Sequence, residues 1–379
     1  MKKLGLTIFF DSFALMLLGL IIVMSASSTY SVFKFDSVFY LFNSHLFKVF
    51  IGIGAIILFA FIPYDIYKSL SKPAIILTTI LLIATLLFAP DIKGAGRWLN
   101  LGLFTLQPAD IAKLVLIIHL SVLLEDKANV IDNYRHGFLY LFIWIMIISG
   151  LIMLQPSISN GIMLIVITLI LIYAGGAKFK HILASMLISG LVIGTVAMIF
   201  PHSRSRILSY IGSIMHGGDL NFQVKQALYS LGSGGIFGVG IGNSMQSNLF
   251  LPEAYGDFIF AILGEELGLL GSITVLLAYL VLFITGIMVA KKVKDRFGQL
   301  LAFGITISIV LDAFVNVAVT TGILPTTGLP LPFISYGGTS LIFLCISVGI
   351  LINIAFTNHM RENGVVYVKD FGNLDEINR

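Results

Sequence analysis

The sequence predicts an all-α integral membrane protein with about ten transmembrane helices. Of its 379 residues, 58% are hydrophobic and only 11% are charged, whereas about 25% are charged in an ordinary soluble domain. A spanning helix needs roughly 20 mostly apolar residues, because the hydrocarbon core is about 30 Å thick. The chain supplies such runs repeatedly, and they are too long and continuous for the strands of a membrane barrel.

Ten long apolar runs, each bounded by polar or turn-forming residues, are the expected helices. They cover residues 8–28, 44–63, 73–89, 107–124, 137–154, 158–175, 181–200, 257–290, 300–322 and 337–357. The first part of the eighth, Asp257 to Gly268, carries acidic residues, and its apolar part starts near Leu269. The first run is interpreted as an uncleaved signal anchor. We expect one transmembrane domain over residues 1–357 and a polar cytoplasmic tail over 358–379.

The basic residues predict the orientation, because Lys and Arg concentrate in cytoplasmic loops. With the N-terminus in the cytoplasm, the cytoplasmic segments hold fifteen Lys and Arg residues and the outer segments hold seven. Both termini are therefore expected in the cytoplasm. The largest outer loop, 201–256, lies between the seventh and eighth helices and is rich in glycine from Gly232 to Gly242. Its length and apolar stretches predict short helices or re-entrant segments. Shorter outer loops cover 90–106 and 323–336.

Several kinds of site are missing from the sequence. Cys345 is the lone cysteine, which excludes an intrachain disulfide and a cysteine metal cluster. The sequence has no Walker loop, which argues against ATP-driven transport by this chain, and no HExxH or Cys/His metal set. The Gly238-x-Gly240-x-Gly242 pattern lacks the βαβ unit of a dinucleotide site and is expected outside the cell.

Asp110 and Lys113 form the first candidate site, at the start of the fourth helix after Pro108. An unpaired charge in a bilayer costs about 2.5–3.5 kcal/mol, so retained charges suggest function. Proline and an acid suit the first helical turn, and residues three apart share one face. The pair would line a polar cavity that opens outward, or would only stabilise the helix start.

Asp257 is the candidate general base, because a partly desolvated carboxylate at the outer mouth of a helix suits that role. The alternative is an N-terminal helix cap. Guanidinium and ammonium groups on the outer side suit pyrophosphate or lipid headgroups, although some would only anchor the interface. These groups belong to Arg97, Arg204, Arg206 and Lys225. Hydrogen bonding between helices is the alternative for the deeper ionisable groups, which are Asp11, Asp312, His119, Glu265 and Glu266.

Five stretches resemble motifs of the SEDS (shape, elongation, division and sporulation) family of peptidoglycan glycosyltransferases. They are Lys93–Trp98 (KGAGRW), Leu106–Leu114 (LQPADIAKL), Gly232–Ser244 (GSGGIFGVGIGNS), Leu251–Gly268 (LPEAYGDFIFAILGEELG) and Thr321–Gly338 (TGILPTTGLPLPFISYGG). The resemblance runs in order from about residue 10 to 355. Residues 239–246 and 154–157 look more like the division type (FtsW) than the elongation type (RodA), with a sporulation paralogue as a further alternative.

The resemblance implies a multi-pass protein of the bacterial cytoplasmic (inner) membrane that polymerises lipid II on the outer face. The C4 hydroxyl of GlcNAc attacks the anomeric carbon of MurNAc, undecaprenyl pyrophosphate leaves, and the configuration inverts. Such a reaction needs a base for the hydroxyl and cations for the leaving group. A divalent cation such as Mg²⁺ could assist at the pyrophosphate. A class B penicillin-binding protein and other divisome or elongasome membrane proteins are the implied partners, and no nucleic acid is expected.

By motif match, Asp257 takes the catalytic position, and Arg97 is the first candidate for phosphate contact. Substrate binding is further expected of Asp110, Lys113, Arg204, Arg206, Lys225 and Glu253. The chain departs from the family pattern at Gly96, Asp110, Ser157, Tyr255-Gly256 and Asp312, which stands where glutamine is common. The alternative functions are a lipid II flippase, a scaffold that recruits partners, and the RodA-type elongation polymerase.

Overall fold

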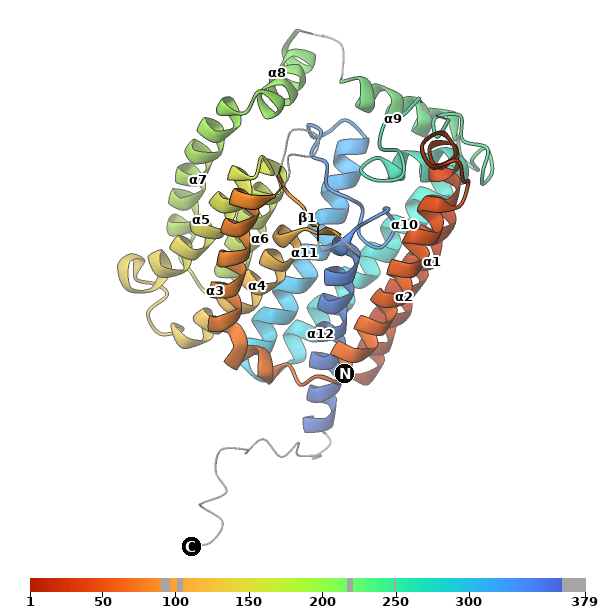
Figure 1. The fold of residues 1–379 in the computed structure, drawn as a ribbon. Coiled ribbons are helices and arrows are strands. Elements are labelled where there is room, and N and C mark those ends of the chain that lie inside the picture. Colours follow the sequence, from red (N-terminus) through yellow and green to blue (C-terminus); the bar gives the residue numbers. More distant parts are fainter. Residues whose placement is uncertain (90–95, 101–104, 217–220, 249, 363–379) are drawn as a thin grey trace, which may run out of the picture.

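Long helices run along a common axis in the computed structural model of the protein (Figure 1). The structure describes residues 1–89, 96–100, 105–216, 221–248 and 250–362, so the motif residue Lys93 and the tail beyond Glu362 lie outside the described residues. The helices are α1 (Lys2–Phe35), α2 (Tyr40–Phe61), α3 (Asp65–Phe88), α4 (Pro108–Asp126), α5 (Leu139–Leu154) after a π-turn (Tyr134–Phe138), α6 (Ile158–Ala174), α7 (Phe179–Ile199), α8 (Pro201–His216), α9 (Phe222–Ser233), α10 (Ile259–Lys292), α11 (Arg296–Thr320) and α12 (Thr339–Glu362).

Eight of the described helices are long and apolar enough to cross a membrane: α1, α2, α3, α5 with its π-turn, α7, α10, α11 and α12. This confirms a multi-pass, all-α membrane protein. The α6 helix is apolar but shorter, and α4 carries charges at both ends, including Asp110 and Asp126. The count of ten spanning helices stays a prediction.

Most predicted helix ends lie within a few residues of those observed, and the clearest difference is in α3. Its start was predicted at Pro73, whereas the helix begins at Asp65 and continues through the proline. Proline removes one backbone hydrogen bond without ending a helix that has neighbouring support. Here α3 packs along α4, and an ion pair from Lys68 to Glu125 at 2.5 Å joins the first turns of α3 to the end of α4.

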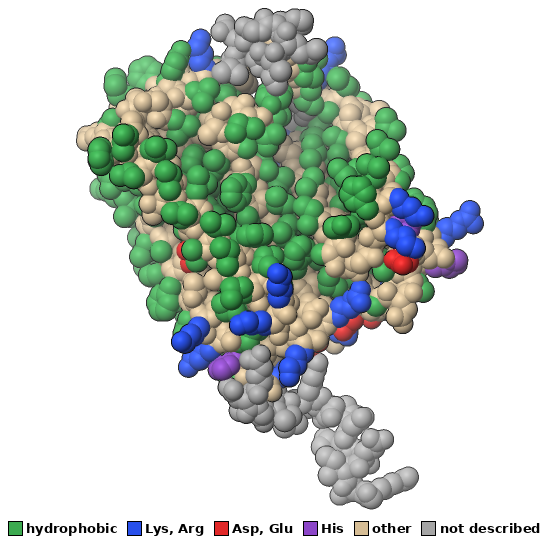
Figure 2. All heavy atoms as spheres, turned by 180° about the vertical axis from the view of Figure 1, so that it is seen from behind, with side chains coloured by type: hydrophobic (Ala, Val, Ile, Leu, Met, Phe, Trp, Pro, Cys, Tyr) green, Lys and Arg blue, Asp and Glu red, His purple; other side chains and the backbone are tan. Residues whose placement is uncertain are grey.

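The two ends of the bundle differ in character. At one end, which we call the terminal end, Lys2 and Arg361 line the same cavity. Arg361 there forms ion pairs with Asp65 at 2.8 Å and Asp295 at 3.3 Å. Figure 2 shows Lys and Arg side chains gathered toward this end, with hydrophobic side chains covering the flank. The opposite end, the site end, holds α8, α9 and the residues discussed below (Figure 1).

The core of the bundle is built around α4. Its residues from Leu116 to Leu124 are all buried, and the helix packs against α3, α5, α6, α11 and α12. The α12 helix also packs against α2, while α10 packs between α1 and α11. This burial explains why α4 lacks the lipid-facing apolar stripe of the outer helices, since its surroundings are protein on every side.

The segment 201–256 contains two short helices, α8 and α9, which confirms the expectation that it is not free coil. On which side of the membrane it lies stays a prediction. One small element was not predicted: Leu99–Asn100 (β1) pairs antiparallel with Thr105–Leu106 (β2), with Leu99 opposite Leu106. Two-residue strands are too short to leave an alternating hydrophobic pattern in the sequence.

Candidate functional site

Asp257 lies in a turn whose backbone is held by two other parts of the chain. Asn316 of α11 donates to the carbonyl of Asp257 at 2.8 Å and to the carbonyl of Leu329 at 2.7 Å. Ser335 donates its hydroxyl to the carbonyl of Gly256 at 2.7 Å. The N-cap residue of α10 is Phe258, so Asp257 precedes the cap position, contrary to the capping alternative. Its position is therefore fixed by tertiary contacts.

The carboxylate of Asp257 faces Gly328, in the segment that follows α11. A Cβ at Gly328 would lie 3.3 Å from Oδ2 of Asp257 and 4.0 Å from Nη1 of Arg206. The φ of Gly328 is +74°, a conformation that side chains other than glycine rarely adopt. Glycine therefore lets the backbone approach both charged groups without crowding them.

Arg97 and Arg206 line a groove of about 340 Å³ next to this point. Arg97 donates to the backbone carbonyls of Gln155 and Pro156, and Arg206 donates to the carbonyl of Thr326 at 3.4 Å. Burial lowers the pKa of both guanidinium groups, Arg206 lowers that of Arg97 further, and the charge of Asp257 raises both. Apolar groups complete the wall, including those of Ile158, Ile162, Met163, Val166, Ile207, Leu311 and Val315.

This groove combines two cations, one adjacent carboxylate and an apolar wall. The cations suit a phosphate-containing group. The apolar wall suits a hydrocarbon chain. The carboxylate is placed where it can accept a proton from a group held beside the phosphates. An amphiphilic phosphate ester fits all three features.

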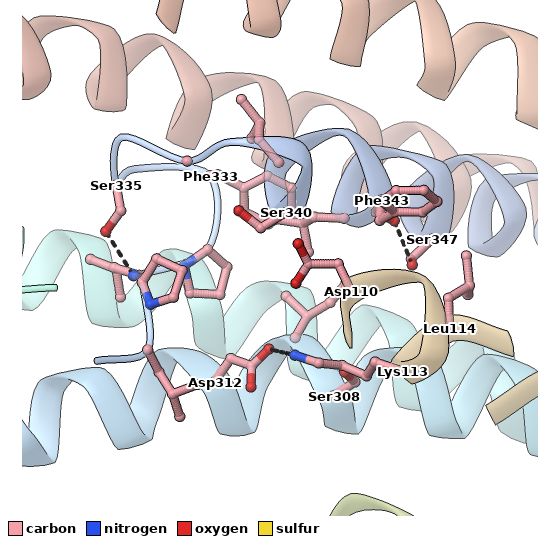
Figure 3. A pocket seen from close by; sticks show the side chains of 18 of the residues that line it. Asp110, Lys113, Leu114, Ser308, Asp312, Phe333, Ser335, Ser340, Phe343 and Ser347 are labelled. Carbon is pink, nitrogen blue, oxygen red and sulfur yellow. Dashed lines mark hydrogen bonds and ion pairs between the residues drawn. The ribbon is translucent and has the colours of Figure 1, made fainter. Parts of the chain in front are cut away.

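Asp110 and Lys113 line a second, smaller cavity of about 80 Å³ between α4, α11 and α12 (Figure 3). The i,i+3 pairing expected from the sequence is not the ion pair that forms. Instead, Nζ of Lys113 lies 2.6 Å from Oδ2 of Asp312 on α11, and Asp110 accepts a hydrogen bond from Thr339 at 3.5 Å. The site thus holds two carboxylates and one ammonium group, and the other oxygen of Asp312 has no hydrogen-bond partner among the described residues.

The groove and the cavity are neighbours that share the side chain of Asn160 in their linings. The segment after α11 joins them as well, because Thr326–Gly328 line the groove and Leu329–Phe333 line the cavity. The sequence did not single out Asn160. Its only signal is a polar residue in the first turn of an otherwise apolar helix.

Three of the predicted substrate-binding residues lie outside the linings of both the groove and the cavity. Arg204 is exposed on α8, and Lys225 is half-buried on α9. Glu253 is in the turn before Asp257 and has a φ of +56°. Its carbonyl accepts from the backbone N–H groups of Gly256 and Phe258, so it shapes the turn that presents Asp257.

The remaining ionisable groups in apolar runs mostly have hydrogen-bond partners between helices, as the alternative reading expected. His119 of α4 hydrogen-bonds Ser71 of α3 at 2.7 Å. Glu265 and Glu266 are buried and accept hydrogen bonds from the segment that precedes α10. Asp11 lines a cavity with Lys3 near the N-terminus, far along α1 from the site end.

The donor set beside Asp257 does not fit a resident divalent cation. Among the described residues, no three His, Cys, Asp or Glu side chains form a group that could hold a metal. The charged groups that interact with Asp257 include the guanidinium groups of Arg97 and Arg206, whereas Mg²⁺ prefers oxygen ligands.

Comparison with known proteins decides the family. The sequence model of the FtsW/RodA/SpoVE family, described as cell cycle proteins, matches residues 6–360. The chain belongs to this family. That confirms the resemblance drawn from the motifs.

Individual family members agree with this assignment. The probable peptidoglycan glycosyltransferase FtsW of Geobacter metallireducens is 35% identical over 358 residues, which cover 93% of this chain and 95% of that protein. The stage V sporulation protein E of Bacillus subtilis is also 35% identical, over 90% of this chain and 94% of that protein. The first name agrees with the predicted likeness to the FtsW type. The second relative has the same sequence identity, so the sporulation type stays an alternative.

Solved structures share the fold of this chain. One, described as showing structural coordination of polymerization and crosslinking by a peptidoglycan synthase complex, superposes with a TM-score of 0.74 at 22% identity, over 93% of this chain and 97% of that chain. The rod shape determining protein RodA of Thermus thermophilus superposes with a TM-score of 0.69 at 22% identity, over 93% of this chain and 96% of that chain.

Proposed function

We propose that the protein is an inverting peptidoglycan glycosyltransferase that polymerises lipid II on the outer face of the bacterial cytoplasmic membrane, in septal synthesis during cell division. The observation that carries this proposal is an apolar-walled groove at the site end that holds Arg97 and Arg206, with the carboxylate of Asp257 beside it at Gly328. Relatives named as peptidoglycan glycosyltransferases support the same reaction.

In the proposed mechanism, Asp257 accepts the proton of the acceptor C4 hydroxyl as that oxygen bonds to the anomeric carbon of the donor. The bond from this carbon to undecaprenyl pyrophosphate breaks, and its electron pair leaves with the phosphate oxygen. Arg97 and Arg206 stabilise the negative charge that develops there. A divalent cation, if one takes part, would arrive bound to the pyrophosphate.

The orientation follows from the same proposal. The terminal end, with its gathered Lys and Arg side chains, lies in the cytoplasm, together with both chain ends. The site end then faces outward, where lipid II presents its sugars. A class B penicillin-binding protein is the proposed partner, as suggested by the synthase complex that shares this fold, together with other division or elongation proteins of the membrane.

A lipid II flippase is the second candidate, favoured by the charged cavity of Asp110, Lys113 and Asp312 between spanning helices. One assay separates the two. Purified protein, alone and with its cognate penicillin-binding protein, is incubated with lipid II. Glycan strands support the polymerase, whereas lipid II scrambling across vesicles without strands supports the flippase. An elongation or sporulation role is tested by which growth defect the gene's depletion causes.

Replacing Arg206 by alanine is expected to lower kcat/KM for lipid II about 10- to 100-fold, since a charge-assisted hydrogen bond contributes about 1.5–3 kcal/mol. Lysine should restore only part of the loss, because it lacks the planar fork. Arg204→Ala, two residues away and exposed, is the matched variant and should lose less. Equal losses for both variants would mean that general surface charge, and not the groove, binds the substrate.

Asn316→Leu is expected to lower kcat more than it raises KM, because two carbonyls around Asp257 lose their donor. Each unsatisfied buried group costs about 1–3 kcal/mol, so the melting temperature should fall too. Asn353→Leu is the control, since Asn353 makes a similar pair of backbone hydrogen bonds at the terminal end, to Ala60 and Tyr64. It should destabilise the protein but leave kcat per folded molecule unchanged. A fall in kcat for both variants would refute a positioning role.

A further inference from the structure

The α10 helix is broken near its start, and another segment forms hydrogen bonds with the backbone groups at the break. Gly268 has a φ of 65° and a ψ of −165°, which interrupts the helical hydrogen bonding. Residues 234–245, which we call the glycine-rich segment, lie against this point. Leu269 and Leu270 donate their N–H groups to the carbonyls of Gly235 and Ile236, at 2.9 and 3.2 Å. Unpaired backbone groups at a helix break are costly in a bilayer, and here they are paired.

The pairing runs in the other direction as well. Val239 and Gly240 donate their N–H groups to the carbonyls of Glu265 and Glu266, at 2.9 and 3.0 Å. Glycine is required for this close approach, because a Cβ at Gly238 would lie 2.1 Å from the Glu266 carbonyl oxygen. The segment and the broken helix therefore complete each other's backbone hydrogen bonds.

Two buried carboxylates fasten the segment further. Glu265 accepts hydrogen bonds from the Ser244 hydroxyl at 2.6 Å and the Met245 N–H at 3.0 Å. Glu266 accepts from the Gly242 N–H at 3.1 Å and from the hydroxyl of Ser25 on α1. Polar groups of the segment thus point inward, onto α10 and α1.

Its large apolar side chains are left facing outward. Phe237 is 80% exposed and Met245 is 69% exposed. Three more exposed apolar residues belong to the segment: Ile236, Val239 and Ile241. Ile236 lies beside the exposed apolar surface of α10, because its carbonyl accepts the N–H of Leu270, which is itself exposed. Exposed apolar side chains gathered in one short segment mark an interaction site.

We propose that the glycine-rich segment docks on lipid, with these five side chains inserted at the acyl boundary of the leaflet on the site side. About 35 Å of helix, at about 1.5 Å per residue, separates Gly268 from the lysines at the far end of α10. The hydrocarbon core is about 30 Å thick. The break and the segment therefore lie at its boundary, where apolar side chains and an internally paired backbone are both favourable.

The docking has a consequence for the groove, which rests on the proposed function. Glu265 and Glu266 lie on the short first part of α10, which starts directly after the turn that holds Asp257. A segment anchored in the leaflet would set the height of Asp257 above the membrane. The pyrophosphate of a lipid-linked substrate lies at that level.

The test measures lipid contact and is independent of enzyme activity. In a Cys345→Ser background, single cysteines at Phe237, Ile241 and Met245 carry a fluorescent label in reconstituted vesicles. Doxyl-labelled phosphatidylglycerol and aqueous iodide serve as quenchers. Ser37→Cys, exposed in the turn after α1, is the water control, and Leu277→Cys, exposed on α10, is the lipid control.

We expect doxyl quenching within about twofold of the Leu277 site and iodide quenching at least about fivefold below the Ser37 site, as for an interfacial anchor. Iodide quenching equal to that at Ser37, without doxyl quenching, would overturn the proposal in favour of a water-exposed loop. Protection from both quenchers would overturn it in favour of a protein contact. All three positions are exposed, and each is labelled in a separate variant. If one variant cannot be labelled, the other two still give independent quenching measurements.

Discussion

Replacing Asp257 by asparagine is expected to abolish glycan-strand formation from lipid II while the protein still folds. Asparagine has nearly the same shape but cannot accept the hydroxyl proton, and loss of a general base costs about 10²- to 10⁴-fold in rate. The turn that presents residue 257 is held through backbone atoms by Asn316 and Ser335, so the substitution leaves that support in place. The measurement is strand length and yield with purified protein and its penicillin-binding protein.

Asp11→Asn is the matched control for this prediction. It makes the same chemical change in a carboxylate of α1 that lies near Lys3, away from the groove. Strand synthesis should be retained in this variant, and both variants should elute and melt like the unchanged protein. If Asp257→Asn protein made strands at the normal rate, Asp257 would not be the base, and the proposed mechanism would be wrong.

Lys113→Met is expected to be the most destabilising single change in the cavity between α4, α11 and α12, lowering the free energy of unfolding by about 3 kcal/mol. It would leave Asp110 and Asp312 facing the same cavity with no ammonium group between them. Removing one partner of a buried ion pair costs about 3–5 kcal/mol, and the partial exposure of this pair, 21% and 13%, argues for the lower end. The melting temperature in detergent should fall by several degrees.

Asp312→Leu should cost clearly less, because Asp110 remains close enough to Lys113 to take over as its partner. The double variant Lys113→Met/Asp312→Leu should be more stable than Lys113→Met alone, which a double-mutant cycle measures. Lys68→Met serves as the control, since its ion pair with Glu125 is more exposed and should contribute less than about 1 kcal/mol. Equal losses for Lys113→Met and Asp312→Leu would show that Asp110 does not compensate.

The family could be predicted from the sequence because its motifs are local. Motifs such as Leu251–Gly268 can be identified from residue order and spacing alone, without knowing how the helices pack. The break in α10 was not predicted: the sequence indicated one helix over 257–290, with only a change from acidic to apolar residues near Gly268. Asp110 and Lys113 line one cavity, as their spacing predicted, but the ion-pair partner of Lys113 lies on another helix, which the pattern of a single helix cannot indicate.

The sequence by itself determined the membrane class and the approximate helices, because the thickness of the hydrocarbon core sets the length of an apolar run. It also gave the candidate base, because the motif around Asp257 is local. The tertiary structure decided which charges meet. Lys113 and Asp312 are 199 residues apart, and Arg97, Arg206 and Asp257 come from three separate segments. The glycine-rich segment likewise finds its hydrogen-bond partners on α10. Contacts between side chains on different helices depend on how those helices pack and rotate, and periodicity within one helix carries no record of its neighbours.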